Sequence, residues 1–227
     1  LDEYYVTHSA AGMADFIPSG GSGDNDYILT YNALNREMYV ALLLTNGLYQ
    51  ETLITAIYGK FENNWKLNII IFGPYKLLGK GPFELFNLAK VSYNKSYLMD
   101  AADFIYLSHA CIKPAADRLH YQREGEIESF YKKVIKETND KYRFPLVLKN
   151  VDSKPTIFNI YPEMTHGFFP VIEYVSNIKL KDTIDLKIEN EKIKKEIGKT
   201  FTGLDKDKKY IYYKAFNEMP ADKNKLY

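Results

Sequence analysis

Short apolar runs bounded by turn residues occupy the first third of the chain, and this pattern predicts β-strands. The runs cover residues 4–7, 27–31, 37–44, 52–58 and 65–72. The run 37–44 would also suit a helix, but turn residues on both sides of it favour a strand. The last two flank the Asn63-Asn64 pair, which predicts a β-hairpin because asparagine tolerates the positive φ angles of tight turns. Pro74 and the later Gly81-Pro82 pair are expected to end the sheet, since proline donates no hydrogen bond to a strand partner.

In the middle of the chain, the apolar residues recur at helical spacing instead of forming short runs. Helices are expected over residues 83–89, 97–111 and 124–139. Pro114 follows the second helix, a common place for proline because it cannot continue a helix. In the third helix the apolar residues recur every three or four positions and so share one face: Ile127, Phe130, Tyr131, Val134 and Ile135.

The last third returns to strand-like patterns around one charged helix. Strands are expected at residues 144–148, 156–161, 169–175 and 210–216. Asp182 is placed to cap a helix that extends to Lys199. Four isoleucines are the expected core contacts of that helix: Ile184, Ile188, Ile193 and Ile197.

Together these elements predict an α+β fold with antiparallel sheets, a central helical segment and two sheet-forming halves. The boundary is expected between residues 139 and 144. Residues 1–140 would then form an antiparallel sheet with a helical hairpin and a third helix, and residues 141–227 a smaller β-rich α+β domain. The composition, 46% hydrophobic and 26% charged, suits a chain that buries a core.

The charge balance argues against a general affinity for nucleic acid. The chain has 30 Lys and Arg residues against 29 Asp and Glu residues. The lysine-rich stretch 187–209 is interleaved with acidic residues, which is typical of a solvated helix face. No apolar run approaches the length of a membrane-spanning helix. We therefore expect no nucleic-acid partner and no transmembrane segment in this chain.

The single cysteine and the histidines give no recognisable site. Cys111 lies in an apolar helical stretch and is expected to be a buried small side chain. His8, His109, His120 and His166 lack the spacing of a zinc site, although His120 and Glu124 would share a helix face if the third helix began early. His166, in a predicted turn, is the strongest lone candidate for a functional base.

Serine and carboxylate patterns are equally unspecific. Ser9 follows His8, but adjacency in sequence does not create a nucleophile–base pair. Asp100 and Asp103 are expected to be exposed carboxylates on the second helix. Two further acidic residues, Asp24 and Asp26, alternate in the glycine-rich loop 18–26 without the other ligands of a calcium loop. We therefore assign no catalytic residue, no metal and no cofactor.

The helices around residues 83–114 carry a partial repeat pattern. Tyr93, Ala102, Tyr106 and Pro114 fall at spacings that resemble one tetratricopeptide repeat, a helix–turn–helix unit. His109 departs from the repeat by occupying a position for a small residue, and the chain has no second copy. The resemblance implies a helical hairpin, with protein docking through residues 83–112 as one alternative function.

The hairpin that contains Trp65 resembles strands of NTF2-like or cystatin-like domains. That resemblance implies a curved antiparallel sheet around an apolar pocket, and so a small-molecule-binding protein or enzyme as a second alternative. A pocket lined by converging histidine and carboxylate groups would support this alternative. A filled core with an exposed tyrosine-rich patch would instead support a binding module.

As a whole, the chain resembles exported or lipid-anchored proteins of unknown role from Gram-negative bacteria. The resemblance implies a periplasmic or outer-membrane-associated location. The first residue is Leu, which is compatible with a removed export signal or N-terminal lipid anchor. The chain also has 20 tyrosines, residues common at contact surfaces. We therefore predict a non-catalytic exported binding or assembly module whose ligand is a peptide, glycan or partner protein.

Overall fold

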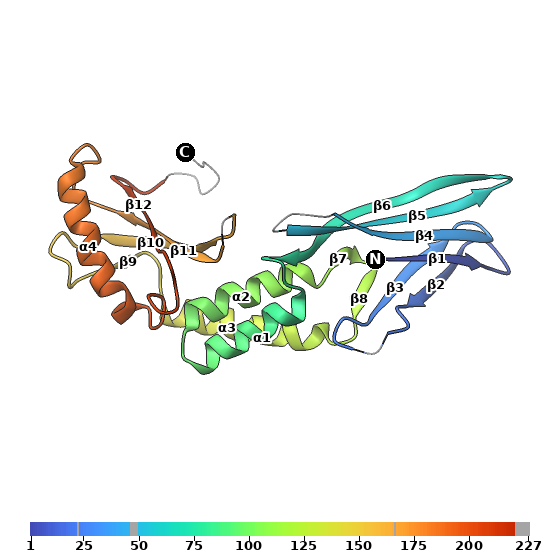
Figure 1. Cartoon of the computed structure of the whole chain (residues 1–227), viewed down its shortest axis with the longest axis horizontal. Helices are drawn as coiled ribbons and strands as arrows, with labels where there is room; N and C mark the ends of the chain where they lie inside the picture. The colour runs from blue at the N-terminus through green and yellow to red at the C-terminus, as the bar shows by residue number, and fades with distance from the viewer. Residues whose placement is uncertain (22, 46–49, 166, 221–227) are drawn as a thin grey trace. The chain divides into compact units, whose positions relative to one another are not determined.

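The α+β prediction is confirmed by the computed structural model, which describes residues 1–21, 23–45, 50–165 and 167–220 (Figure 1). The chain divides into two compact units. Unit 1 contains Leu1–Leu88 and Phe104–Lys132, and unit 2 contains Ala89–Asp103 and Lys133–Tyr227. The units alternate along the chain, whereas the sequence predicted one boundary near residue 140.

Unit 1 contains a four-stranded antiparallel sheet in the order β1-β4-β5-β6. Its strands are β1 (Asp2–Thr7), β4 (Glu37–Leu44), β5 (Gln50–Phe61) and β6 (Asn64–Leu77). β5 and β6 form the predicted hairpin, although the residue with positive φ in its turn is Glu62, at 54°. The predicted sheet end at Pro74 is wrong. β6 lies at the sheet edge, and a register shift beside Thr52 accommodates the proline.

A second sheet of unit 1 has the order β2-β3-β8, with β2 at Met13–Pro18, β3 at Tyr27–Ala33 and β8 at Leu119–Tyr121. Every second residue of β3 is buried. The Tyr4 and Tyr27 hydroxyls of the two sheets are hydrogen-bonded at 2.8 Å. The side chains between the sheets form the core of the unit: Leu29, Tyr31, Met38, Val40, Leu42, Leu53 and Ile57.

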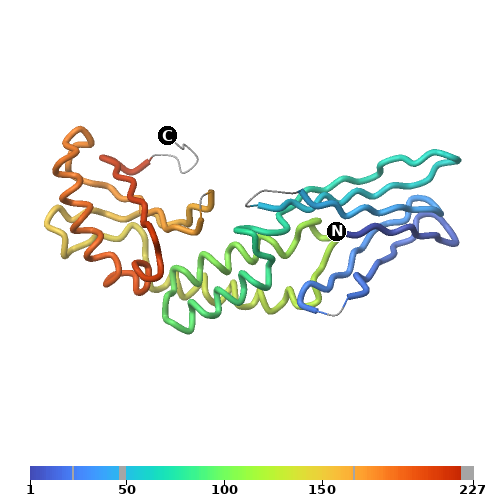
Figure 2. The backbone as a smooth tube through the Cα atoms, in the orientation of Figure 1, coloured from blue at the N-terminus to red at the C-terminus, as the bar shows by residue number. Residues whose placement is uncertain are grey.

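The predicted helices of the middle segment are present as α1 (Pro82–Asn94), α2 (Leu98–Cys111) and α3 (Glu124–Lys141). α1 and α2 form a helical hairpin, and the turn between them includes Ser96 at a φ of 62° (Figure 2). The short strand β7 (Pro114–Asp117) was not predicted. It passes so close to β6 that a Cβ atom on Gly73 would lie 2.2 Å from the Pro114 carbonyl oxygen.

Unit 2 contains the sheet β12-β11-β10-β9, formed by β9 (Leu146–Val147), β10 (Thr156–Glu163), β11 (Phe169–Val175) and β12 (Tyr212–Phe216). β12 runs parallel to β11, and the other pairs are antiparallel. Parallel neighbours need a long connection. Helix α4 (Thr183–Thr200) provides it and lies against this sheet (Figure 1).

The predicted core face of α4 is only half correct. Ile193 and Ile197 are fully buried, but Ile184 is 75% exposed and Ile188 is 52% exposed. Their places on the inner face are taken by Glu189 and Glu196. Residues 189, 193, 196 and 197 follow the helical repeat, whereas residue 184 lies about 140° around the helix from residue 189. Asp182 is the N-cap residue, yet its side chain makes no capping hydrogen bond.

Among the described residues, no helix combines the length and the hydropathy that a membrane crossing requires.

Candidate functional site

The histidine and serine at the start of the chain do not act on each other. His8 Nε2 lies 3.0 Å from Asp15 Oδ2 and 3.0 Å from the Tyr31 hydroxyl. The Ser9 hydroxyl instead donates to Met13 Sδ at 3.7 Å. The pKa of Asp15 is lowered first by the Phe16 backbone N–H and then by His8. This cluster ties β1 to β2 and β3, beside an open pocket of about 300 Å³ that Asp15 and Tyr31 help to line.

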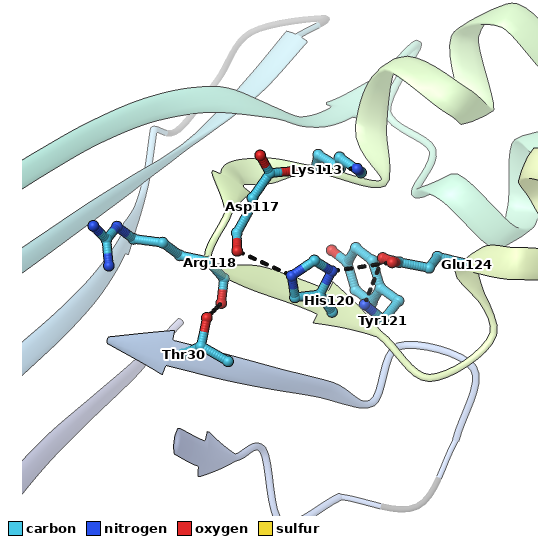
Figure 3. A network of polar contacts seen from close by, with 7 residues as sticks. All are labelled: Thr30, Lys113, Asp117, Arg118, His120, Tyr121 and Glu124. Atoms are coloured by element: carbon cyan, nitrogen blue, oxygen red, sulfur yellow. Dashed lines mark hydrogen bonds and ion pairs between the residues drawn. The ribbon is translucent and has the colours of Figure 1, made fainter. Parts of the chain in front are cut away.

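His120 belongs to a separate network between β8 and α3 (Figure 3). Its Nδ1 lies 3.0 Å from Glu124 Oε1 and its Nε2 lies 3.0 Å from the Asp117 carbonyl oxygen. The hydrogen bond to Glu124 raises the pKa of His120. The same carboxylate accepts a hydrogen bond from the Tyr121 N–H at 3.2 Å. His120 is in β8 rather than in the third helix, and this network positions the first turn of α3.

The remaining candidates are also held apart. Cys111 is fully buried, as predicted, and burial raises its pKa to about 12, so it is a protonated thiol at neutral pH. His109 stacks on Tyr131 with ring centroids 4.2 Å apart. Asp24 pairs with Arg123 instead of converging on Asp26. His166 lies outside the described residues.

Two carboxylates of α2 were predicted to be exposed. Asp103 is half-buried, and burial raises its pKa. The prediction is wrong for Asp100. Its side chain is 8% exposed, and it forms an ion pair of 2.6 Å with Lys208, whose side chain is 5% exposed. Burial raises the pKa of Asp100, and Lys208 opposes that rise. The lysine comes from the connection between α4 and β12. The pair therefore anchors that connection to the start of α2 and leaves the carboxylate no freedom as a base.

The predicted pocket of converging histidine and carboxylate groups is not among the described pockets. The largest of these, of about 570 Å³ in unit 2, is lined by Tyr93, Glu137 and Lys141 among others and by no histidine. Within the described chain, no three His, Cys, Asp or Glu side chains are grouped to hold a metal ion. The stronger candidate for a functional site is an exposed surface.

Such a surface lies on the outer side of the β1-β4-β5-β6 sheet. One cross-strand row on this side consists of Tyr5, Tyr39, Tyr58 and Leu67, which pair in register. Trp65 packs over this row, with its ring centroid 6.0 Å from that of Tyr5 and 6.1 Å from that of Tyr39. Trp65 is 42% exposed, so the hairpin presents its indole ring to solvent.

Aliphatic rows continue the surface along the strands. In the next row Ala41 pairs with Ala56, and Ala56 pairs with Ile70. Leu43, Ile54 and Phe72 pair in the row after that. Ile70 is 48% exposed and Phe72 is 62% exposed. We call the outward side chains of these rows the apolar sheet face: Tyr5, Tyr39, Leu43, Ile54, Tyr58, Trp65, Leu67, Ile70 and Phe72.

Polar groups are confined to the margin of the apolar sheet face. Lys60 Nζ forms an ion pair of 2.8 Å with Glu37, and that contact lowers the pKa of Glu37. Tyr5 donates its hydroxyl hydrogen bond to Glu37, and Tyr39 donates to Glu3. These bonds occupy the polar tips of the two tyrosines. Their rings remain available for contact with another surface.

Comparison with protein-family models, curated proteins and solved structures finds no significant match to this chain. The sequence assigned these residues to strands but did not reveal the surface they form. A usable signal was present, because residues 39–44 and 69–72 are continuous apolar runs. Such runs are typical of strands covered on both faces, whereas half-exposed strands alternate apolar and polar residues. In the described structure these strands are covered by the core on one face only.

The predicted docking groove along the helical hairpin has little support by comparison. Most large apolar side chains of residues 83–112 are buried, including Phe86, Leu98 and Ile105. Within that range, only Val91 and Tyr106 are large apolar residues with more than a third of their surface exposed. Two isolated side chains do not form a continuous apolar patch.

Proposed function

We propose that this protein is a non-catalytic assembly module whose apolar sheet face binds the same face of a second copy of the chain. The observation that carries the proposal is the face itself, with one apolar row across all four strands, two more across β4, β5 and β6, and charge only at its margin. Contiguous exposed apolar patches of this kind mark interaction sites in soluble proteins. The exported location implied by the sequence resemblance stays a prediction.

The size of the apolar sheet face suits a protein partner. Four strands about 4.8 Å apart and about seven residues long at 3.4 Å per residue span roughly 19 by 24 Å. The accessible area of such a corrugated surface exceeds this flat projection. It therefore approaches the roughly 600 Å² per partner found at the small end of stable interfaces. Its aliphatic rows offer no hydrogen-bonding groups to a glycan.

Charge and shape favour a second copy over a different protein. The chain has a net charge of only +1 at pH 7, so two copies experience little mutual repulsion. The ion pair of Lys60 and Glu37 is internally balanced and does not select an oppositely charged partner. Two sheets with apolar faces pack readily against each other at about 10 Å separation.

Sedimentation analysis of the full chain tests the proposal. We expect a reversible dimer at micromolar concentrations for the wild type. The double variant Leu67→Lys/Phe72→Lys places two ammonium groups on the apolar sheet face, and it should raise the dissociation constant by about 100-fold or more because both charges lose water in the dimer.

A matched double variant separates the face from general surface hydrophobicity. Leu34→Lys/Leu180→Lys adds the same charge at residues that are 52% and 47% exposed but lie outside the face. It should dimerise like the wild type. Circular dichroism checks that each variant is folded. A wild-type chain that remains monomeric throughout, or a dimer equally weakened by the control variant, would disprove the proposal.

A further inference from the structure

A cationic side chain without a partner borders the open pocket of about 300 Å³ in unit 1. The Arg118 guanidinium forms no ion pair or hydrogen bond with the described residues, and only the backbone of Arg118 is bonded, to Thr30 and Ala115. Figure 3 shows this side chain directed away from the network of His120 and Glu124. Arginine is a permanent cation in proteins. The pocket therefore carries a positive charge that no described carboxylate neutralises.

The pocket lies on the outer face of the β2-β3-β8 sheet. Phe16 pairs with Thr30, and the Thr30 N–H donates to the Arg118 carbonyl oxygen at 2.7 Å, so these three residues form one row across the sheet. Ala14 and Asn32 pair in the next row. Both rows alternate with the buried positions of β3, which places their side chains on the solvent side.

Asp15 and Tyr31 also border the pocket, but their side chains belong to the opposite face of the sheet. The two residues pair in register, and Tyr31 is 2% exposed. Asp15 Oδ2 lies on that inner side, 3.0 Å from His8 Nε2 and 3.4 Å from the Tyr31 hydroxyl. Asp15 Oδ1 accepts the Phe16 N–H at 2.8 Å. The Asp15 carboxylate is therefore engaged away from the pocket and does not compete for Arg118.

The rest of the outer face adds a neutral donor and an aromatic ring. Asn32 is exposed, and its amide makes no hydrogen bond within the described chain, so it offers two N–H donors beside the guanidinium. Phe16 is 60% exposed. It stands at the other end of the row from Arg118, two strand spacings or roughly 10 Å away along the backbone. A ligand that spans the row meets hydrogen-bond donors at one end and a ring at the other.

We propose that this pocket binds a carboxylate carried on an aromatic group. The planar guanidinium fork of Arg118 matches a carboxylate in a bidentate manner, and the ligand's ring packs on Phe16. One cation balances the single charge of a carboxylate, whereas a phosphate monoester brings nearly two charges. The same chemistry is offered by a free aromatic acid and by a C-terminal phenylalanine of a peptide. The site is on a different sheet from the apolar sheet face and does not depend on dimerisation.

The test is an NMR titration of the full chain at pH 7 with 3-phenylpropionate and with Nα-acetyl-phenylalanine, which represents a peptide C-terminus. We expect saturable shifts of the amide signals of Phe16, Thr30 and Asn32 at roughly millimolar concentrations, as suits a ligand of this size. Tighter binding of Nα-acetyl-phenylalanine identifies a peptide as the source, and tighter binding of 3-phenylpropionate identifies a free acid.

Two further ligands test the role of the carboxylate. 3-Phenylpropanamide keeps the ring without the charge and should bind at least tenfold more weakly than 3-phenylpropionate. Phenyl phosphate should bind no more tightly than 3-phenylpropionate. Equal binding of the propanamide, tighter binding of phenyl phosphate, or no binding of either acid overturns the proposal.

Variants of the two ends of the row separate the guanidinium from the ring. Arg118→Gln should weaken binding of both acids at least tenfold, whereas Arg143→Gln, which removes the same charge from an exposed arginine of unit 2, should bind like the wild type. Phe16→Ser should weaken binding of 3-phenylpropionate at least threefold and leave binding of propionate unchanged. Circular dichroism checks that each variant is folded. If Arg118→Gln binds both acids as the wild type does, or Arg143→Gln loses binding equally, the proposed site is wrong.

Discussion

Two lysine–carboxylate pairs in this chain have the same length but very different surroundings. Lys208 and Asp100 are 2.6 Å apart with side chains 5% and 8% exposed. Lys136 and Asp140 are also 2.6 Å apart, with side chains 78% and 63% exposed. Water screens the second pair and is largely excluded from the first. The two pairs therefore isolate the effect of burial on an ion pair of fixed geometry.

Replacing Lys208 with methionine should destabilise the protein by about 3–5 kcal/mol at pH 7, because it leaves the Asp100 carboxylate buried without its cation. Lys136→Met is the matched control and should unfold at nearly the same urea concentration as the wild type. Urea unfolding followed by circular dichroism measures both. A Lys208→Met variant as stable as the control would show that the buried pair contributes nothing.

The destabilisation by Lys208→Met should also depend on pH in a defined direction. Burial already raises the pKa of Asp100, and loss of the lysine raises it further. For a carboxyl with a raised folded-state pKa, stability is highest below the unfolded-state pKa of about 3.9 and falls as pH rises through the folded-state pKa. The deficit of the variant should therefore shrink as the pH falls from 7 toward the unfolded-state pKa. A constant deficit would contradict this origin.

The burial of Asp100 could not be predicted from the sequence, for a physical reason. Helical spacing shows that Asp100 and Asp103 share a turn of α2, and it predicts an exposed pair by default. The partner that buries Asp100 is 108 residues away. Cys111 needed no distant partner, because its own apolar neighbours predict burial correctly.

At the level of elements, strands and helices with strong local patterns were predicted well, and their orientation was not. The bounds of β4 and β11 match the apolar runs. The hairpin of β5 and β6 was predicted at the right place, although the residue with positive φ in its turn is Glu62 and not an asparagine. β7 and β8 escaped prediction because strands of four and three residues are too short to show a period. The helix α4 was predicted, but its buried face was predicted from four isoleucines, of which two are buried and two are exposed.

The face of α4 that is buried in the structure leads to a prediction that differs from the one expected from the spacing of its isoleucines. Ile184→Lys should leave the urea midpoint almost unchanged, because this side chain is 75% exposed. Ile193→Ala should destabilise the protein by about 2–5 kcal/mol, because it leaves a cavity at a fully buried position. Urea unfolding of the two variants decides between the faces. A large loss for Ile184→Lys with little loss for Ile193→Ala would reverse the orientation of the helix.

At the level of the whole molecule, the sequence predicted the α+β class but not the surface that carries the proposed function. Apolar runs report that a strand is suited to burial, without saying what covers each face. The core of unit 1 covers one face of the β1-β4-β5-β6 sheet, and the outer face is left to a partner in our proposal. The net charge of the chain then affects dimerisation, since two like-charged copies must approach each other.

This dependence on net charge leads to a prediction about pH and salt. Acidification from pH 7 to pH 5.5 makes the chain more positive, because histidine and carboxyl groups take up protons. The ion pair at the margin of the apolar sheet face should change little, since Lys60 lowers the pKa of Glu37. We therefore expect weaker dimerisation at pH 5.5 through repulsion between whole chains, measured by sedimentation at an ionic strength of about 0.01 M, where the Debye length is about 30 Å.

Salt distinguishes this long-range repulsion from a local change at the interface. At about 1 M ionic strength the Debye length is near 3 Å, and charges outside the contact no longer act between the copies. The dissociation constants at pH 5.5 and pH 7 should then coincide, because the apolar contact itself does not titrate. If dimerisation remains weaker at pH 5.5 in high salt, a titrating group lies inside the interface, and the apolar sheet face is not the surface through which the copies bind.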